Sequence, residues 1–132
     1  MTIRFDLALA VSIVALCAST ASAYDLNGAW ANNADSCAKI FTGKGGATTF
    51  KPKSDIYGSG FIVSGKEIRG RFARCRITSQ KEDGQIINLL AACSTDIMLS
   101  NVQFSIKIVD DKMIKRQFPG MPELELQYSR CP

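Results

Sequence analysis

Apolar and polar residues alternate along most of the chain after residue 45, which is the pattern of β-strands with one buried face. In residues 102–108 every second residue is apolar, starting with Val102 and Phe104, and the residues between them are polar. Residues 124–128 repeat this alternation. Residues 86–93 are almost continuously apolar, as in a strand that is buried on both faces. The pattern predicts an all-β protein.

Turn-forming residues separate these runs and set the number of strands. Asp83-Gly84 and the loop 119–122 are two such signals. We predict strands near residues 28–32, 47–51, 59–64, 67–78, 85–93, 99–109, 112–118 and 123–130. Short connections make sequential strands pair antiparallel, and closure into a barrel removes exposed strand edges. We expect a small antiparallel up-and-down β-barrel of about eight strands, with an open sandwich as the alternative.

One short N-terminal helix fits residues 34–41. Asn33 or Asp35 can cap its start, and Gly43 can end it. The interior of an eight-stranded barrel is either filled by side chains or holds one small ligand. The sequence does not decide between these two interiors.

The first 23 residues have the three parts of a secretory signal peptide. Arg4 supplies the positive start, residues 7–16 are apolar, and Ala21-Ser22-Ala23 is a small-residue cleavage site. We predict residues 1–23 as a signal peptide and residues 24–132 as a single β-barrel domain. The protein is then exported, either to a bacterial periplasm or as a secreted protein. A lipid anchor on Cys17 is a weaker alternative, because a large Leu precedes that cysteine.

Four cysteines remain after the signal peptide, and their wide spacing favours two disulfides over a zinc site. The hairpin around Asp83-Gly84 places Cys75 opposite Cys93, within the distance that a disulfide bridges. Cys37 then pairs with Cys131, provided that the helix folds back across the barrel.

Chemistry is limited by the absence of histidine from the chain. Neither a Ser-His-Asp triad nor a Cys-His pair can form, so acid–base work would fall to carboxylates, Lys or Tyr. We expect no enzymatic activity, cofactor or metal, and no transmembrane segment. A histidine-free hydrolase or lyase that uses carboxylates is an alternative.

Arginines are concentrated in residues 69–76, within a chain of net charge +4. Arg69, Arg71, Arg74 and Arg76 would all point outward if a bulge near Ala73–Arg74 shifted the alternation. They form a candidate surface for an anionic partner. A solvated strand face that protects against edge pairing is the alternative, and the sequence favours it. The net charge is too small to indicate a nucleic-acid-binding protein.

Two terminal motifs carry a resemblance to a known family. The first predicted strand contains Gly28-Ala29-Trp30, and the last contains Arg130 on its inward face. A first-strand G-x-W whose Trp is covered by an Arg of the last strand resembles the calycin signature, found in lipocalins and small periplasmic metalloprotease inhibitors of bacteria. The resemblance implies a barrel closed at one end by Trp30 and Arg130. The alternative is a core Trp and a separate surface Arg.

The function that we expect first is binding, of a small apolar ligand or of a protein partner, by an exported barrel. A periplasmic protease inhibitor is the alternative that the resemblance implies. Residues 24–27 leave only a short segment ahead of the first strand to enter a protease cleft, and the sequence identifies no other inhibitory segment.

Overall fold

The computed structural model describes residues 24–132. The predicted signal peptide, its cleavage site after Ala23 and the alternative anchor residue Cys17 lie outside the described residues. Among the described residues, no helix is long and apolar enough to cross a membrane.

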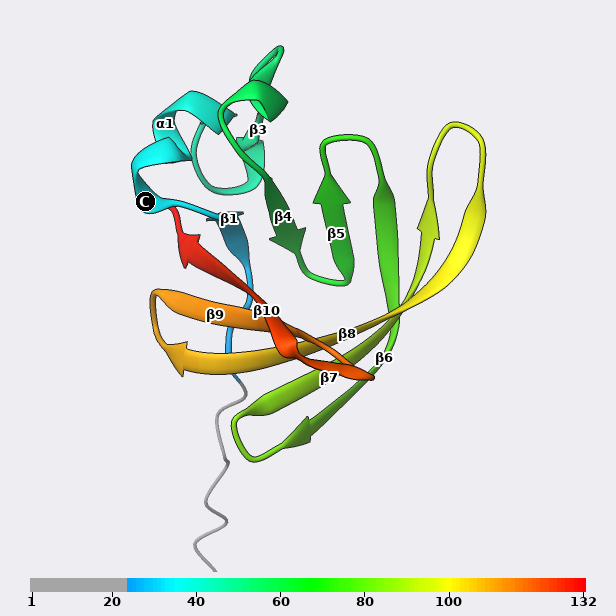
Figure 1. The fold of residues 1–132 in the computed structure, drawn as a ribbon. Helices are drawn as coiled ribbons and strands as arrows, with labels where there is room; N and C mark the ends of the chain where they lie inside the picture. Colours follow the sequence, from blue (N-terminus) through cyan, green and yellow to red (C-terminus); the bar gives the residue numbers. More distant parts are fainter. Residues whose placement is uncertain (1–23) are drawn as a thin grey trace, which may run out of the picture.

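Eight antiparallel strands form a closed barrel (Figure 1). The strands are β1 (Gly28–Ala31), β4 (Gly60–Ser64), β5 (Glu67–Gly70), β6 (Arg74–Asp83), β7 (Ile86–Ser94), β8 (Leu99–Asp110), β9 (Met113–Phe118) and β10 (Met121–Arg130). β1 closes the barrel because it pairs with both β4 and β10, so no barrel strand is left with an open edge along its full length. The predicted up-and-down barrel is confirmed, and the sandwich alternative is wrong.

The predicted strand 67–78 is in fact two strands, β5 and β6. The chain reverses at residues 71–73, where the Gly70 N–H donates to the Ala73 carbonyl at 2.8 Å, and Ile68 then lies opposite Cys75. The change in alternation that we attributed to a bulge near Ala73–Arg74 is therefore a hairpin turn. The bulge prediction is wrong because a reversal changes the apparent phase of the pattern in the same way.

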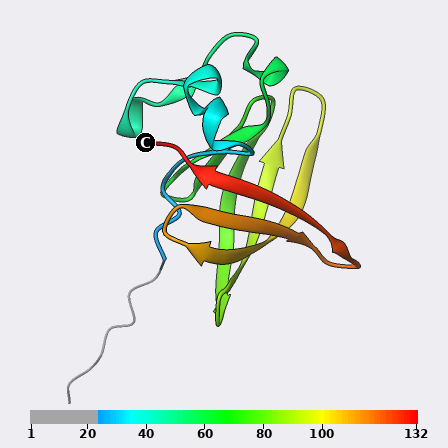
Figure 2. The same cartoon turned by 60° about the vertical axis from the view of Figure 1, so that its left-hand side comes forward.

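The predicted barrel strand 47–51 lies outside the barrel. Within this range the strand is β3 (Thr49–Phe50), which pairs with β2 (Phe41–Thr42) and with no barrel strand in the described part of the chain. These two strands belong to the segment that connects β1 to β4. Figure 2 shows this segment, in cyan to green, gathered on one side of the barrel beside the C-terminus. Local alternation alone does not say which sheet a strand joins, so the sequence could not reveal this.

The predicted helix is present as two short pieces. A 3-10 helix, η1 (Ala34–Ser36), leads into α1 (Cys37–Ile40), and the Asn33 side chain accepts a hydrogen bond from the Asp35 N–H at its start. Asn33 is thus the capping residue, as the sequence indicated. The helix ends at Ile40, before Gly43.

Apolar side chains pack on both faces of β1. Trp30 points into the barrel, and Ala29 and Ala31 point outward. The two alanines form a small outer core with Ile40 and Phe41, which cover the barrel wall from outside. The larger core fills part of the barrel interior. Covering the outer face of β1 thus fixes α1 against the wall.

Both predicted disulfides are confirmed. Cys75 and Cys93 are direct cross-strand partners in β6 and β7, with Cα atoms 4.0 Å apart. Cys37 of α1 and Cys131 after β10 have Cα atoms 5.6 Å apart. The second bridge links chain positions 94 residues apart and ties α1 to the C-terminus.

Candidate functional site: the barrel interior and its open end

One end of the barrel is closed by Trp30 and Arg130, which are paired in register on β1 and β10. The guanidinium carbon of Arg130 lies 4.3 Å from the centroid of the Trp30 ring, and Trp30 is fully buried. The indole Nε1–H donates to the Leu26 carbonyl at 2.9 Å. The structure therefore brings the two residues of the terminal motifs together in a cation–π contact.

The hydrogen bonds of Arg130 explain how this end stays closed. Its guanidinium donates to the backbone carbonyls of Asp25 at 2.6 Å, of Asp111 at 2.9 Å, and of Asn27. These carbonyls belong to the segment before β1 and to the turn between β8 and β9. The Arg130 side chain thus joins its own strand, β10, to both of these segments across the barrel end. Gly28 has a φ of 126°, a conformation that favours glycine.

Inside the barrel lies a cavity of about 220 Å³. Its walls are mostly aliphatic and aromatic, and no Asp or Glu is among the described residues that line it. The lining residues are Leu26, Gly60, Phe61, Val63, Ile68, Gly70, Ala73, Cys75, Leu89, Phe104, Ile106, Ile114, Arg116 and Tyr128. The barrel interior is therefore partly hollow, which the sequence left undecided.

Among residues 24–132, Arg116 is the one cation that lines the cavity. In β9 the alternation places Ile114 and Arg116 inward and Lys115 outward, where Lys115 forms a 3.7 Å ion pair with Glu125. The guanidinium carbon of Arg116 lies 4.6 Å from the ring centroid of Phe104 and 4.7 Å from that of Phe118. Two aromatic rings thus hold the guanidinium without neutralising it.

The charge of Arg116 is unusual for a barrel interior. Its Nε atom is buried and has no hydrogen-bond partner, and no ion pair joins Arg116 to a carboxylate within residues 24–132. Burial lowers the pKa of Arg116 below its ordinary value, and the nearby Tyr128 offsets this only in part. Arg116 nevertheless stays protonated at neutral pH, because arginine does not lose its proton in proteins. The cavity wall therefore carries a partly buried positive charge that is not paired with a carboxylate of residues 24–132.

Arg116 is a site residue that the sequence-based prediction did not include, although the residue pattern around it contains a signal. Ile114, Arg116 and Phe118 have the spacing of one strand face, and two of the three are apolar. A cation on the apolar face of a predicted strand is a departure from binary patterning.

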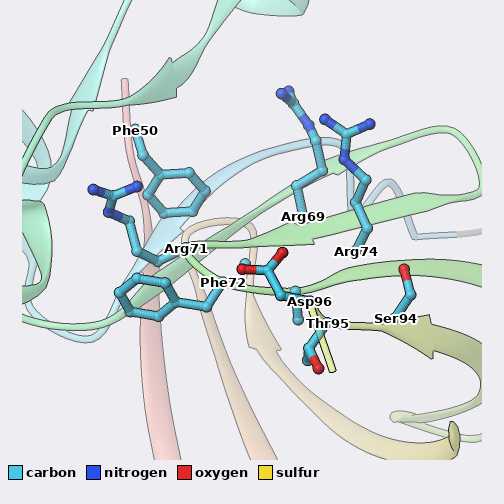
Figure 3. Close-up of a pocket in the computed structure, with 10 residues that line it drawn as sticks. Phe50, Arg69, Arg71, Phe72, Arg74, Ser94, Thr95 and Asp96 are labelled. Carbon is cyan, nitrogen blue, oxygen red and sulfur yellow. The ribbon is translucent and has the colours of Figure 1, made fainter. Parts of the chain in front are cut away.

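Three of the four clustered arginines surround a cleft at the other end of the barrel. Arg69, Arg71 and Arg74 line this open cleft of about 400 Å³. Figure 3 shows Arg69 and Arg74 extending side by side from β5 and β6, with Arg71 next to Phe50. Arg76 is not among the residues that line this cleft and lies opposite Glu67. Arg76 lines a second open cleft together with Arg74 and Glu67, so Arg74 borders both clefts.

Two of these arginines already have partners. Arg69 lies 3.3 Å from a Glu67 carboxylate oxygen and donates to the Thr48 carbonyl at 3.1 Å. Arg71 lies 4.0 Å from Asp55. Arg74 is exposed and forms no ion pair with the residues that the structure describes. Part of the positive charge of the cleft is therefore compensated within the protein.

The cleft and the cavity are adjacent, because Gly70 and Ala73 line both. Large apolar side chains are exposed at this end of the barrel, in the β5–β6 turn at Phe72 and in the β7–β8 loop at Ile97. Phe72 is 70% exposed and Ile97 94% exposed. The end of the barrel next to the cavity thus carries arginines and exposed apolar side chains.

Within residues 24–132, no three Cys, Asp or Glu side chains lie close enough together to hold a metal ion.

Comparisons with protein-family models, with curated proteins and with solved structures found no match to this chain.

Proposed function

We propose that this protein is an exported, non-catalytic binding protein that holds one small, mainly apolar ligand inside its barrel. The observation that carries the proposal is the cavity of about 220 Å³ with its aliphatic and aromatic walls. Ligand sites are typically concave and apolar, with a few polar groups that orient the ligand. Arg116 and Tyr128 are the ionisable groups of this kind in the cavity wall.

The composition of the cavity supports binding over catalysis. Acid–base catalysis without histidine needs a carboxylate, Lys or Tyr with a suitable pKa at the reacting group. No carboxylate lines the cavity among residues 24–132, and Arg116 is too weak an acid to exchange protons near neutral pH. Tyr128 has no base beside it in the lining of the cavity as described.

Export is supported by two features. The first 23 residues have the pattern of a signal peptide. The described chain has two disulfides, which persist in oxidising compartments such as the periplasm or the extracellular space. Trp30 and Arg130, which carry the calycin resemblance, lie together at the closed end of the barrel.

Native mass spectrometry of the protein purified from its host without detergent tests the proposal. We expect a bound molecule that is retained in the native spectrum and lost when the protein is denatured. Extraction into organic solvent should recover the same mass. A native spectrum of bare protein, together with no binding of any short-chain alkyl compound, would contradict the proposal.

A second candidate function is recognition of an anionic partner at the cleft. The observation in its favour is the juxtaposition of exposed Arg71 and Arg74 with exposed Phe72. Replacing Arg71 and Arg74 by Gln should weaken such binding, whereas Arg76→Gln is the matched control outside the cleft. Binding through these arginines should also weaken with salt, because exposed charges are screened. If neither the double substitution nor added salt weakens binding of the partner, this candidate function is excluded.

A further inference from the structure

Arg116 is a partly buried cation in the wall of an apolar cavity, and it loses part of its hydration there without gaining an ion pair in residues 24–132. Charged groups in protein interiors are normally paired, because burial removes their hydration. Arg116 has no such pair in residues 24–132, and its Nε is buried. In contrast, the neighbouring Lys115 on the outer face has Glu125. The pairing that Arg116 lacks can come from a ligand in the cavity.

The surroundings of Arg116 hold its guanidinium in place for such a partner. Phe104 and Phe118 contact it through their rings, and ring contacts use none of the N–H donors of the guanidinium. The planar fork of an arginine matches the two oxygens of a carboxylate. A group held in advance loses less conformational entropy when the ligand binds.

We infer that the ligand of the barrel is a short-chain alkyl monocarboxylate whose carboxylate binds Arg116. This inference rests on the proposed function and specifies the ligand class for that cavity. The charges favour a carboxylate over a phosphate monoester. One cation balances one carboxylate, whereas a phosphate carries about −1.5 to −2 at neutral pH and would leave negative charge unpaired in an apolar space.

The volume of the cavity limits the length of the alkyl chain. At about 30 Å³ for each water-sized group, a space of about 220 Å³ holds about seven such groups. If the carboxylate is counted as one group, a monocarboxylate of roughly six to eight carbons in total fits this space. Octanoate is therefore a suitable probe, and octan-1-ol has the same chain with an uncharged head.

Isothermal titration calorimetry of the purified, oxidised protein at pH 7 tests the inference with octanoate, octan-1-ol and octyl phosphate. We expect octanoate to bind about 10- to 100-fold more tightly than octan-1-ol, which is the usual range for hydrogen bonds to a charged group. Octyl phosphate should bind more weakly than octanoate. This comparison among ligands uses the unaltered protein and needs no variant.

Two substitutions on one strand provide the matched pair. Arg116→Met removes the inward charge, and Lys115→Met removes an outward charge from the next residue. Arg116→Met should lower the affinity for octanoate about 10- to 100-fold and leave the affinity for octan-1-ol within about twofold. Lys115→Met should change neither affinity.

The outcomes separate this inference from the proposed function. Equal affinities of the unaltered protein for octanoate and octan-1-ol would overturn the inference and leave the proposed function in place. Tighter binding of octyl phosphate would overturn the choice of a carboxylate. Binding of none of the three probes would contradict both the inference and the proposed apolar site. If Arg116→Met fails to fold, Arg116→Gln and the ligand comparison still decide.

Discussion

Two inward arginines have opposite roles in this barrel. Arg130 donates to three backbone carbonyls and covers Trp30, so its charge is well satisfied. Arg116 contacts two aromatic rings and has a buried Nε without a hydrogen-bond partner. Arg130 thus holds one end of the barrel closed, whereas the guanidinium of Arg116 keeps N–H donors that are free to bind a ligand. The stability of variants should separate the two roles.

Arg130→Gln should lower the free energy of unfolding by about 2–3 kcal/mol, because charge-assisted hydrogen bonds to several carbonyls are lost together. Arg74→Gln is the control. It removes an exposed arginine, and we expect a change within about 0.5 kcal/mol. Urea unfolding of both variants measures the difference. Equal and small changes would show that Arg130 does not hold the barrel end.

Arg116→Met should not lower the free energy of unfolding of the ligand-free protein. The substitution replaces a partly buried charge that has no carboxylate partner in residues 24–132 with an apolar side chain of similar length. Replacing buried charges by apolar side chains is often neutral or stabilising by about 1 kcal/mol or more. Urea unfolding with and without octanoate checks this. A loss above about 1 kcal/mol without ligand would mean that Arg116 has a structural role through its ring contacts.

At the scale of elements, the turn between β5 and β6 connects the two spaces of the site. Gly70 and Ala73 line both the cavity and the cleft. A Cβ atom at Gly70 would meet nothing closer than the Ala73 carbonyl oxygen, 3.7 Å away. Alternation places this Cβ on the inward face of β5, together with Ile68. Gly70 is therefore a position where a side chain can be added toward the cavity.

Gly70→Leu should reduce the affinity for octan-1-ol about tenfold or more, equivalent to about 1.4 kcal/mol, because the new side chain occupies ligand space. Ala92→Leu is the matched control, since residue 92 is exposed on the outer face of β7. Calorimetry with both variants, after circular dichroism confirms their folding, gives the result. Unchanged affinity in Gly70→Leu would place the ligand elsewhere.

The elements show which parts of the fold the sequence could predict. Strict alternation in residues 102–108 predicted β8 correctly, because the apolar residues of this segment pack in the barrel interior and the polar residues between them point outward. The reversal at residues 71–73 was missed because Arg71-Phe72-Ala73 contains no Gly, Pro, Asn or Asp that would indicate a turn.

The candidate site was harder to predict than the fold. Trp30 and Arg130 could be linked because a G-x-W in the first strand and an Arg in the last strand together resemble a known signature. Arg116 could not, because a single arginine among apolar residues has no motif, and its significance depends on the absence of a nearby carboxylate. That absence is a property of the assembled barrel and not of a local segment.

At the scale of the whole molecule, two disulfides connect parts of different sequence separation. Cys75–Cys93 joins neighbouring strands 18 residues apart, whereas Cys37–Cys131 joins positions 94 residues apart. In the chain-entropy account, a bridge restricts the unfolded chain more when it closes a longer loop. The bridge to α1 also keeps the outer core of Ile40 and Phe41 on the barrel wall.

Replacing Cys37 and Cys131 by Ser should therefore lower the melting temperature more than replacing Cys75 and Cys93. The expected losses are about 4–5 kcal/mol for the long loop and roughly 3 kcal/mol for the short one. Differential scanning calorimetry of the two double variants measures the order. The reverse order would mean that packing around the cross-strand bridge contributes more than chain entropy.

The cavity, the open end and the closed end together form a barrel with one accessible interior. Nuclear magnetic resonance with methyl-labelled isoleucines tests most directly whether a ligand occupies this interior. In the presence of octanoate, we predict intermolecular Overhauser contacts to the methyl groups of Ile68, Ile106 and Ile114, which line the cavity. The outer-core residues Ile40 and Ile62 should show none. Contacts confined to the exposed Ile97, or no contacts at any isoleucine, would contradict a ligand site inside the barrel.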